Sequence, residues 1–163
     1  MSPPKKYITL KALRKISLCH FLWIIMMGAL LTSARLEAAT VTVAFPHVKN
    51  QSAPIYVAMI NNPQMWDKEV ATNTAYRQVI FHPKAGQPEV RGDIETVEPG
   101  TYAIKVFQDV AGTGKLETDF FGIPTEPYGF SQNPDSFGLP TFSECAFDVT
   151  NAPLTLMIQL QNQ

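Results

Sequence analysis

Cysteine is scarce in this chain of 163 residues, which contains only Cys19 and Cys145. Cys19 lies in an N-terminal segment that we expect to be removed, so Cys145 would stand alone and no internal disulfide could form. The fold must therefore be stabilised by a hydrophobic core. The residues after position 39 are numerous enough to bury one such core, and we expect a single domain over residues 40–163.

Basic residues are also scarce once the N-terminus is set aside. Six of the 13 Lys and Arg residues, but only one of the 14 acidic residues, lie within residues 1–39, so the remainder carries a formal net charge of −6. An acidic domain without a Lys/Arg cluster repels nucleic-acid phosphates and is not attracted to anionic lipid. We therefore expect no nucleic-acid partner, and no membrane partner after the N-terminal segment has been removed.

Long apolar runs are absent except for Ile16–Leu31, which follows a basic stretch and precedes a region of small residues. This order is typical of a secretory signal peptide, which we place at residues 1–39, with cleavage after Ala38 or Ala39 and a second candidate site after Ala34. An uncleaved anchor is the alternative, but a membrane span needs roughly 20 apolar residues and this run is short for one. We therefore expect an exported protein, either periplasmic or secreted.

The rest of the chain is rich in short stretches in which apolar and polar residues alternate. A period of two residues is typical of a half-buried β-strand. Turn residues separate these stretches, and no amphipathic helix of ordinary length is predicted. The pattern indicates an all-β fold, a single antiparallel β-sandwich of about seven strands, immunoglobulin- or prealbumin-like, after an N-terminal signal helix. The expected strands are 40–45, 55–60, 76–82, 88–97, 101–108, 145–149 and 154–160.

Two short patterns add local detail. Asn62 followed by Pro63 predicts a brief helix over residues 64–70, because Asn caps helix N-termini and Pro is tolerated at the first helical position. Tyr102 lies two residues after the turn signal at residues 98–100. This spacing resembles a tyrosine corner, in which the Tyr hydroxyl bonds to backbone a few residues upstream.

Acidic residues and glycines are concentrated in the stretch that follows the fifth expected strand. A calcium loop needs several oxygen ligands close in sequence, and the candidate metal ligands here are Asp109, Glu117 and Asp119. Ala111 and Phe120, however, occupy places where the EF-hand spacing requires oxygen donors. We therefore favour a hairpin turn with solvated acids, and calcium is the only cofactor that this stretch suggests.

The segment after this turn is too long and too apolar for a linker without a structural or functional role. Long loops without secondary structure are often functional. Its aromatic residues could line a shallow binding surface with a carboxylate as the polar element. The alternative is that the aromatics fold back and cover one open edge of the sandwich. The aromatic residues that could line this surface are Phe120, Phe121, Tyr128, Phe130 and Phe137, and the residues selected as the candidate surface are Glu126, Tyr128, Phe130 and Asn133.

Recognisable catalytic patterns are absent from the sequence. His47 and His82 have no partner pattern, and neither a G-x-S-x-G nor an H-E-x-x-H motif occurs. Cys145 lies on the expected inward face of a strand, where a free cysteine usually acts as a small core hydrophobe. We therefore expect a protein that is not an enzyme, with a hydrolase using the loop carboxylates as the weaker alternative.

Four segments in this order resemble the bacterial exported proteins grouped as domain of unknown function 2141. The resemblance extends from about Val41 to Leu160. It implies a small β-sandwich of cell-envelope or secreted proteins whose biochemical role is not established. The segments are IYVAMINNPQMWD (55–67), EPGTY (98–102), DVAGTGKLETDF (109–120) and GIPTEPYGFSQN (122–133).

The resemblance also bears on the acidic turn, which in this family usually reads D-x-N-x-N-G-x-L-D. Ala111 and Thr113 depart from that pattern, and this departure weakens an inherited calcium site. The family's G-F-S-N-N stretch is nearly intact as residues 129–133. The positions that keep the turn pattern are Asp109, Gly114, Leu116 and Glu117.

Glycine, proline, aromatic and acidic residues are thus concentrated between Asp109 and Asn133 on an otherwise plain scaffold. We expect an exported, non-catalytic module of the cell envelope that binds a protein or a glycan-like ligand through this segment. A calcium-dependent module with a degenerate acidic loop is the alternative from a different class.

Overall fold

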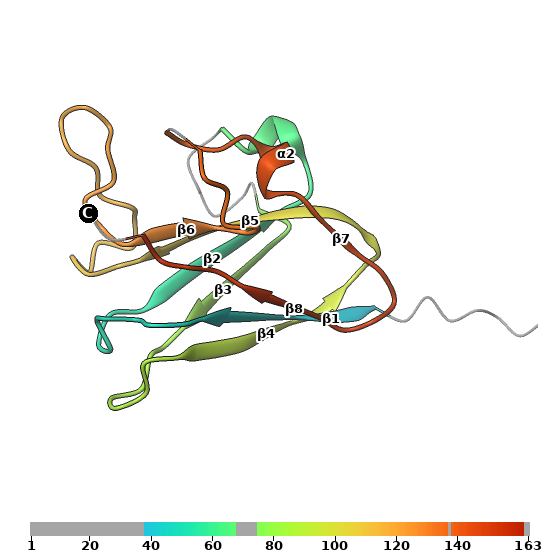
Figure 1. Ribbon diagram of the computed structural model, residues 1–163, viewed down its shortest axis with the longest axis horizontal. Coiled ribbons are helices and arrows are strands. Elements are labelled where there is room, and N and C mark those ends of the chain that lie inside the picture. The colour runs from blue at the N-terminus through green and yellow to red at the C-terminus, as the bar shows by residue number, and fades with distance from the viewer. Residues whose placement is uncertain (1–37, 68–74, 137, 162–163) are drawn as a thin grey trace, which may run out of the picture. The chain divides into compact units, whose positions relative to one another are not determined.

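The computed structural model describes residues 38–67, 75–136 and 138–161 (Figure 1). The expected signal peptide therefore lies outside the described residues, apart from its last two positions, and so do Phe137 and the last three residues, 68–70, of the predicted helix at 64–70. The first strand begins at Ala39, next to the position where we expect the mature domain to begin.

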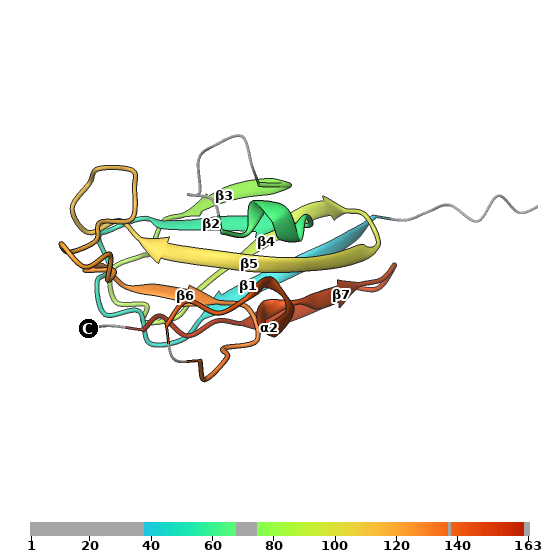
Figure 2. The same cartoon turned by 90° about the horizontal axis from the view of Figure 1, so that it is seen from above.

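Two β-sheets face each other across a hydrophobic core (Figure 1). In the first sheet β1 pairs with β8 in parallel and with β4 in antiparallel orientation. All pairings between the described strands of the second sheet are antiparallel, and β6 and β7 lie end to end along one side of β5 (Figure 2). The predicted all-β sandwich is confirmed. The first sheet has the order β4 (Val90–Val97), β1 (Ala39–Phe45), β8 (Leu154–Met157), and the second has the order β3 (Arg77–Phe81), β2 (Ile55–Ile60), β5 (Gly100–Gln108), with β6 (Tyr128–Phe130) and β7 (Phe147–Val149).

Alternate residues of the central strands form the core, as the period of two predicted. The ring of Phe81 from β3 also lies over Gly92 of β4, where a Cβ atom would come within 2.0 Å of it. Glycine at this position therefore lets the two sheets close along one side. The inward residues of β1, β2 and β5 are Val41, Val43, Phe45, Ile55, Val57, Met59, Tyr102, Ile104 and Val106.

A second, smaller cluster covers the outer face of the second sheet, which explains why β2 is apolar on both faces. Trp66 is its centre, and its ring lies 6.0 Å from that of Phe130 and 5.9 Å from that of Phe142. The Trp66 indole donates a hydrogen bond to Pro140 O at 2.7 Å. The buried members are Ile60, Trp66, Ala103, Phe130 and Cys145.

Two short helices border this cluster. Asn62 caps the 3₁₀-helix η1 (Pro63–Met65) by accepting a hydrogen bond from Gln64 N at 3.0 Å, which confirms the predicted start. Cys145, which was expected to begin a strand, instead ends α2 (Phe142–Cys145). Thr141 and Glu144 form a capping box that starts this helix, so β7 begins only at Phe147.

The predicted tyrosine corner is confirmed. The Tyr102 hydroxyl donates a hydrogen bond to Glu98 O at 2.8 Å, and the Tyr102 ring packs 5.1 Å from that of Tyr76. Burial, together with the neighbouring Tyr76 hydroxyl, raises the pKa of Tyr102 to about 12. The hydrogen bond from Tyr102 thus connects the start of β5 to the turn that precedes it.

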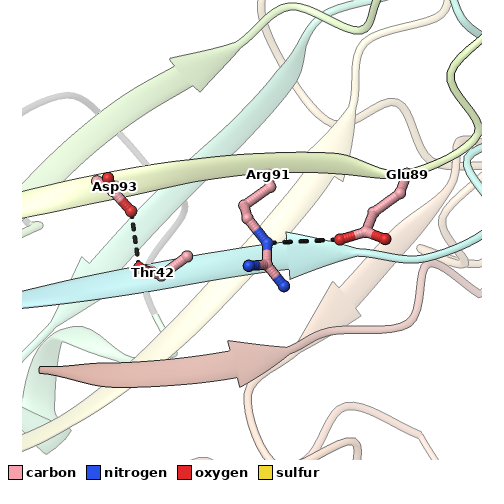
Figure 3. Close-up of polar contacts among 4 residues, drawn as sticks. All are labelled: Thr42, Glu89, Arg91 and Asp93. Atoms are coloured by element: carbon pink, nitrogen blue, oxygen red, sulfur yellow. Dashed lines mark hydrogen bonds and ion pairs between the residues drawn. The ribbon is translucent and has the colours of Figure 1, made fainter.

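The outer face of the first sheet is mostly polar, as expected for a strand with one wet side. The Thr42 hydroxyl donates a hydrogen bond to Asp93 Oδ1 at 2.7 Å, and Arg91 Nε lies 3.4 Å from Glu89 Oε1 (Figure 3). Both side chains of this ion pair are largely exposed, so it contributes little to stability. In the described ranges, no helix has the length and apolar character needed to cross a membrane.

Candidate functional site

The loop between β5 and β6 is organised around the buried carboxylate of Glu126, which is 5% exposed. One oxygen, Oε1, accepts hydrogen bonds from Val110 N at 2.7 Å and Ala111 N at 2.8 Å, and Oε2 accepts one from Glu117 N at 3.1 Å. The expectation that Glu126 is the polar element of a binding surface is therefore wrong. Its oxygens point into the loop and hold together segments that are distant in sequence.

A second buried carboxylate, that of Asp109, shapes the first turn of the loop. Asp109 Oδ1 accepts a hydrogen bond from Thr113 N, and Oδ2 accepts one from Gly114 N, both at 2.9 Å. Gly114 has a φ of +73°, a left-handed conformation that side chains other than glycine's rarely adopt. The acidic, glycine-containing stretch is therefore a turn that is folded around its own carboxylate.

Beyond this turn the loop becomes a small hairpin. Thr118 and Pro124 form an isolated β-bridge, and Thr125 N donates a hydrogen bond to Glu117 O at 2.9 Å. At the tip, Asp119 Oδ1 accepts hydrogen bonds from Phe121 N and Ile123 N, each at 2.9 Å. This third carboxylate fixes the turn at residues 119–123, which we call the tip.

The three candidate metal ligands do not come together. No group of three or more His, Cys, Asp or Glu residues that could hold a metal ion occurs in ranges 38–67, 75–136 and 138–161. The physical reason is visible in the loop, where Asp109 and Asp119 each accept hydrogen bonds from backbone N–H groups of separate turns. Glu117 is exposed and contributes its backbone N–H to Glu126.

The other three residues of the predicted surface are structural as well. Phe130 is only 8% exposed and packs in the second cluster, and Tyr128 is half-buried beside it on β6. Asn133 Oδ1 accepts a hydrogen bond from Gln159 N, and Asn133 Nδ2 donates one to Met157 O, both at 2.7 Å. The aromatics of this strand therefore fold back onto the edge of β5, as the alternative interpretation of the segment proposed.

Residues 129–133 form hydrogen bonds to three parts of the domain, namely β5, the end of α2 and the C-terminal segment. The Ser131 hydroxyl accepts a hydrogen bond from Ile104 N at 2.9 Å and donates one to Cys145 O at 2.5 Å. At Gly129 a Cβ atom would lie 2.5 Å from Gln159 O, so glycine permits the close approach of the C-terminal segment. The motif that gives this chain its family resemblance is thus a structural one.

The accessible aromatic residues of the loop are Phe120, which is 97% exposed, and Phe121, which is 82% exposed. Their rings lie 5.6 Å apart, edge to face. The loop that carries them extends beyond the ends of the strands, at the upper left of Figures 1 and 2. Both were expected among the aromatics that could line a binding surface, but neither is one of the four residues selected as the candidate surface. The other exposed large hydrophobic residues of the loop are Val110, Leu116 and Ile123.

A shallow hollow of about 310 Å³ lies between η1 and α2. Its floor is apolar, and Asp67 is the one titratable group among its six lining residues, which are Pro63, Trp66, Asp67, Thr141, Phe142 and Ser143. Lys105 Nζ lies 4.4 Å from the centre of the Trp66 ring and donates a hydrogen bond to Trp66 O. Burial lowers the pKa of this lysine. The contacts of this lysine are with the central residue of the second cluster.

The comparisons with known proteins identify one family. The model of a bacterial family described as "Uncharacterized protein conserved in bacteria (DUF2141)" matches residues 43–156, which reach from the middle of β1 to β8 and include the whole loop. No curated protein and no solved structure matches the chain.

The buried carboxylate of Glu126 gives a direct prediction. Glu126→Gln keeps the shape of the side chain but replaces one acceptor oxygen by an NH₂ group, so at least one of the three backbone N–H groups loses its partner. We expect the free energy of unfolding to fall by about 1–3 kcal/mol, as measured by urea denaturation. Glu117→Gln, an exposed position in the same loop, is the matched control and should change it by less than about 0.5 kcal/mol. Equal effects of the two substitutions would contradict the role of Glu126.

Proposed function

The chain belongs to this bacterial family, and we propose that it is an exported, non-catalytic binding module of the cell envelope that makes contact through the tip of the loop. The observation that supports this proposal is the near-complete exposure of Phe120 and Phe121 on a loop that is otherwise tightly hydrogen-bonded. Large apolar side chains that gather on a surface mark sites of interaction.

The rigidity of the loop strengthens this argument. A flexible loop exposes apolar side chains only part of the time, whereas here carboxylate–amide hydrogen bonds hold both arms and the tip in place. Leaving a phenylalanine side chain in water rather than burying it costs about 1.5–3 kcal/mol. Two adjacent phenylalanines that are held outward are best explained by a partner that covers them.

The nucleophilic and acidic groups of the domain support a role without catalysis. Ser131 is fully buried and hydrogen-bonded on both sides. Cys145 is buried as well, and this burial raises the pKa of its thiol to about 12. Of the three carboxylates that the hydrolase alternative would use, Glu117, Asp119 and Glu126, the last two accept backbone hydrogen bonds within the loop.

Export is part of the proposal and is tested by the mass of the protein. When the full chain is expressed in a bacterial host, we expect the mature protein to begin after Ala38 or Ala39, because the basic, apolar and small-residue regions follow the order of a cleaved signal. Intact-mass spectrometry measures this directly. Ile24→Arg, which places a charge in the apolar region, should block the cleavage. A wild-type protein that still begins at residue 1 or 2 would contradict cleavage and export.

The proposed contact surface is tested by photo-crosslinking in cells. A benzophenone amino acid at position 121 should form crosslinks to an envelope component, because the tip would lie against its partner. The same amino acid at Thr155, an exposed position on the outer face of the first sheet, is the matched control. Mass spectrometry then identifies the crosslinked species as protein, glycan or lipid. Absence of crosslinks from position 121, or identical crosslinks from both positions, would contradict the proposed surface.

A further inference from the structure

The tip satisfies four of its five backbone N–H groups internally. Phe121 N and Ile123 N donate to the Asp119 carboxylate, Gly122 N donates to Asp119 O at 3.0 Å, and Asp119 N donates to Ile123 O at 2.8 Å. These four N–H groups therefore point into the turn, while the rings of Phe120 and Phe121 point away from it. The tip therefore exposes two large aromatic rings, next to the exposed side chain of Asp119.

This arrangement favours an apolar partner over a polar one. Moving a backbone N–H group out of water is costly when it has no hydrogen-bond partner, and a segment that enters the apolar part of a bilayer must satisfy its polar groups internally. The tip already meets that requirement at four positions. Recognition of a glycan would draw on polar groups as well as on aromatic stacking, and these four N–H groups are not available for it.

The size and shape of the apolar surface also narrow the choice of partner. The side chains of Phe120 and Phe121 offer on the order of 300–500 Å² together, whereas a stable protein–protein interface buries roughly 800 Å² on each partner. The loop is a convex projection beyond the strands (Figure 2). A small convex apolar projection is suited to insertion into the interfacial region of a bilayer.

The charges beside the tip indicate which lipid it would meet. Lys115 is the single basic residue of the loop, and the exposed acids Glu117 and Asp119 lie between it and the two phenylalanines. This distribution gives no attraction to anionic lipid. Insertion would depend on apolar contact alone and would be best tolerated by zwitterionic headgroups.

We propose that the tip inserts Phe120 and Phe121 into the interfacial region of a lipid bilayer with zwitterionic headgroups and so holds the domain at a membrane surface. This inference rests on the proposed function and names the partner of the same loop. The sequence argued against a membrane partner because the mature chain has no basic cluster. Insertion of aromatic side chains requires none, since the attraction comes from apolar burial.

The proposal is tested with phosphatidylcholine vesicles. The wild-type protein, in the form isolated from exporting cells, should float with the vesicles, and its bound fraction should change little when the salt concentration is raised. Replacing Phe120 and Phe121 together by Ser should lower the partition coefficient by at least about tenfold, since two large apolar side chains no longer enter the bilayer. Both positions are exposed, so the urea midpoint should stay unchanged.

A matched control removes two exposed apolar side chains elsewhere. Leu139 and Met157 are both largely exposed and lie outside the loop, and their joint replacement by Ser should leave vesicle binding unchanged. A positive readout comes from Phe121→Trp, whose added fluorescence should shift to shorter wavelength when vesicles are present.

The outcomes separate this inference from the proposed function. If the wild type does not bind vesicles, or if binding survives the double phenylalanine substitution, insertion into lipid is contradicted. In that case crosslinks from position 121 to a protein or a glycan would still support the binding module. If both vesicle binding and crosslinking are absent, the inference and the proposed function fail together.

Discussion

The arrangement of the loop depends on one buried carboxylate, that of Glu126. Glu126 lies sixteen residues after Val110, yet its side chain accepts hydrogen bonds from the N–H groups of Val110, Ala111 and Glu117. Hydrogen bonds to a charged acceptor are stronger than those between neutral groups. The carboxylate thus joins the two arms of the loop at its base. The turn around Asp109 and the tip around Asp119 lie in the segment between these hydrogen-bonded residues.

The residues that stabilise this domain and the residues that it exposes to a partner are not the ones that their residue types suggest. Tyr128, Phe130 and Asn133 resemble binding residues, but they attach β6, the second cluster and the C-terminal segment to one another. Phe120 and Phe121 resemble core residues, but they face solvent. An acidic loop thereby exposes two large aromatic rings at its end, while three of its four carboxylates, those of Asp109, Asp119 and Glu126, accept hydrogen bonds from backbone N–H groups.

Much of the fold could be predicted from the sequence. Strands β1, β2 and β5 follow from their apolar patterns, and the Tyr102 corner and the Asn62 cap follow from local spacing. Strand β6 was missed because it has three residues, one of them Gly129, and lies within a segment rich in proline and turn residues. Its pairing with β5 depends on tertiary packing, which cannot be predicted from the sequence pattern of three residues.

The candidate site was harder to predict, for a related reason. An acid in a loop is usually solvated, and the burial of Glu126 depends on partners up to sixteen residues away. The available signal was the pair Phe120-Phe121 between two turn residues, Asp119 and Gly122, which breaks the strand period and places two large rings at a bend. Whether such rings lie outside or inside is decided by the hairpin that carries them.

The central claim is that Glu126 holds the loop in one conformation, and amide hydrogen exchange measured by NMR on the wild-type protein tests it most directly. The account predicts that the N–H groups of Val110, Ala111 and Glu117 are strongly protected and that all three lose this protection together when the loop opens. Exchange of these three N–H groups at the rate of an unfolded chain, while the strands remain protected, would contradict it.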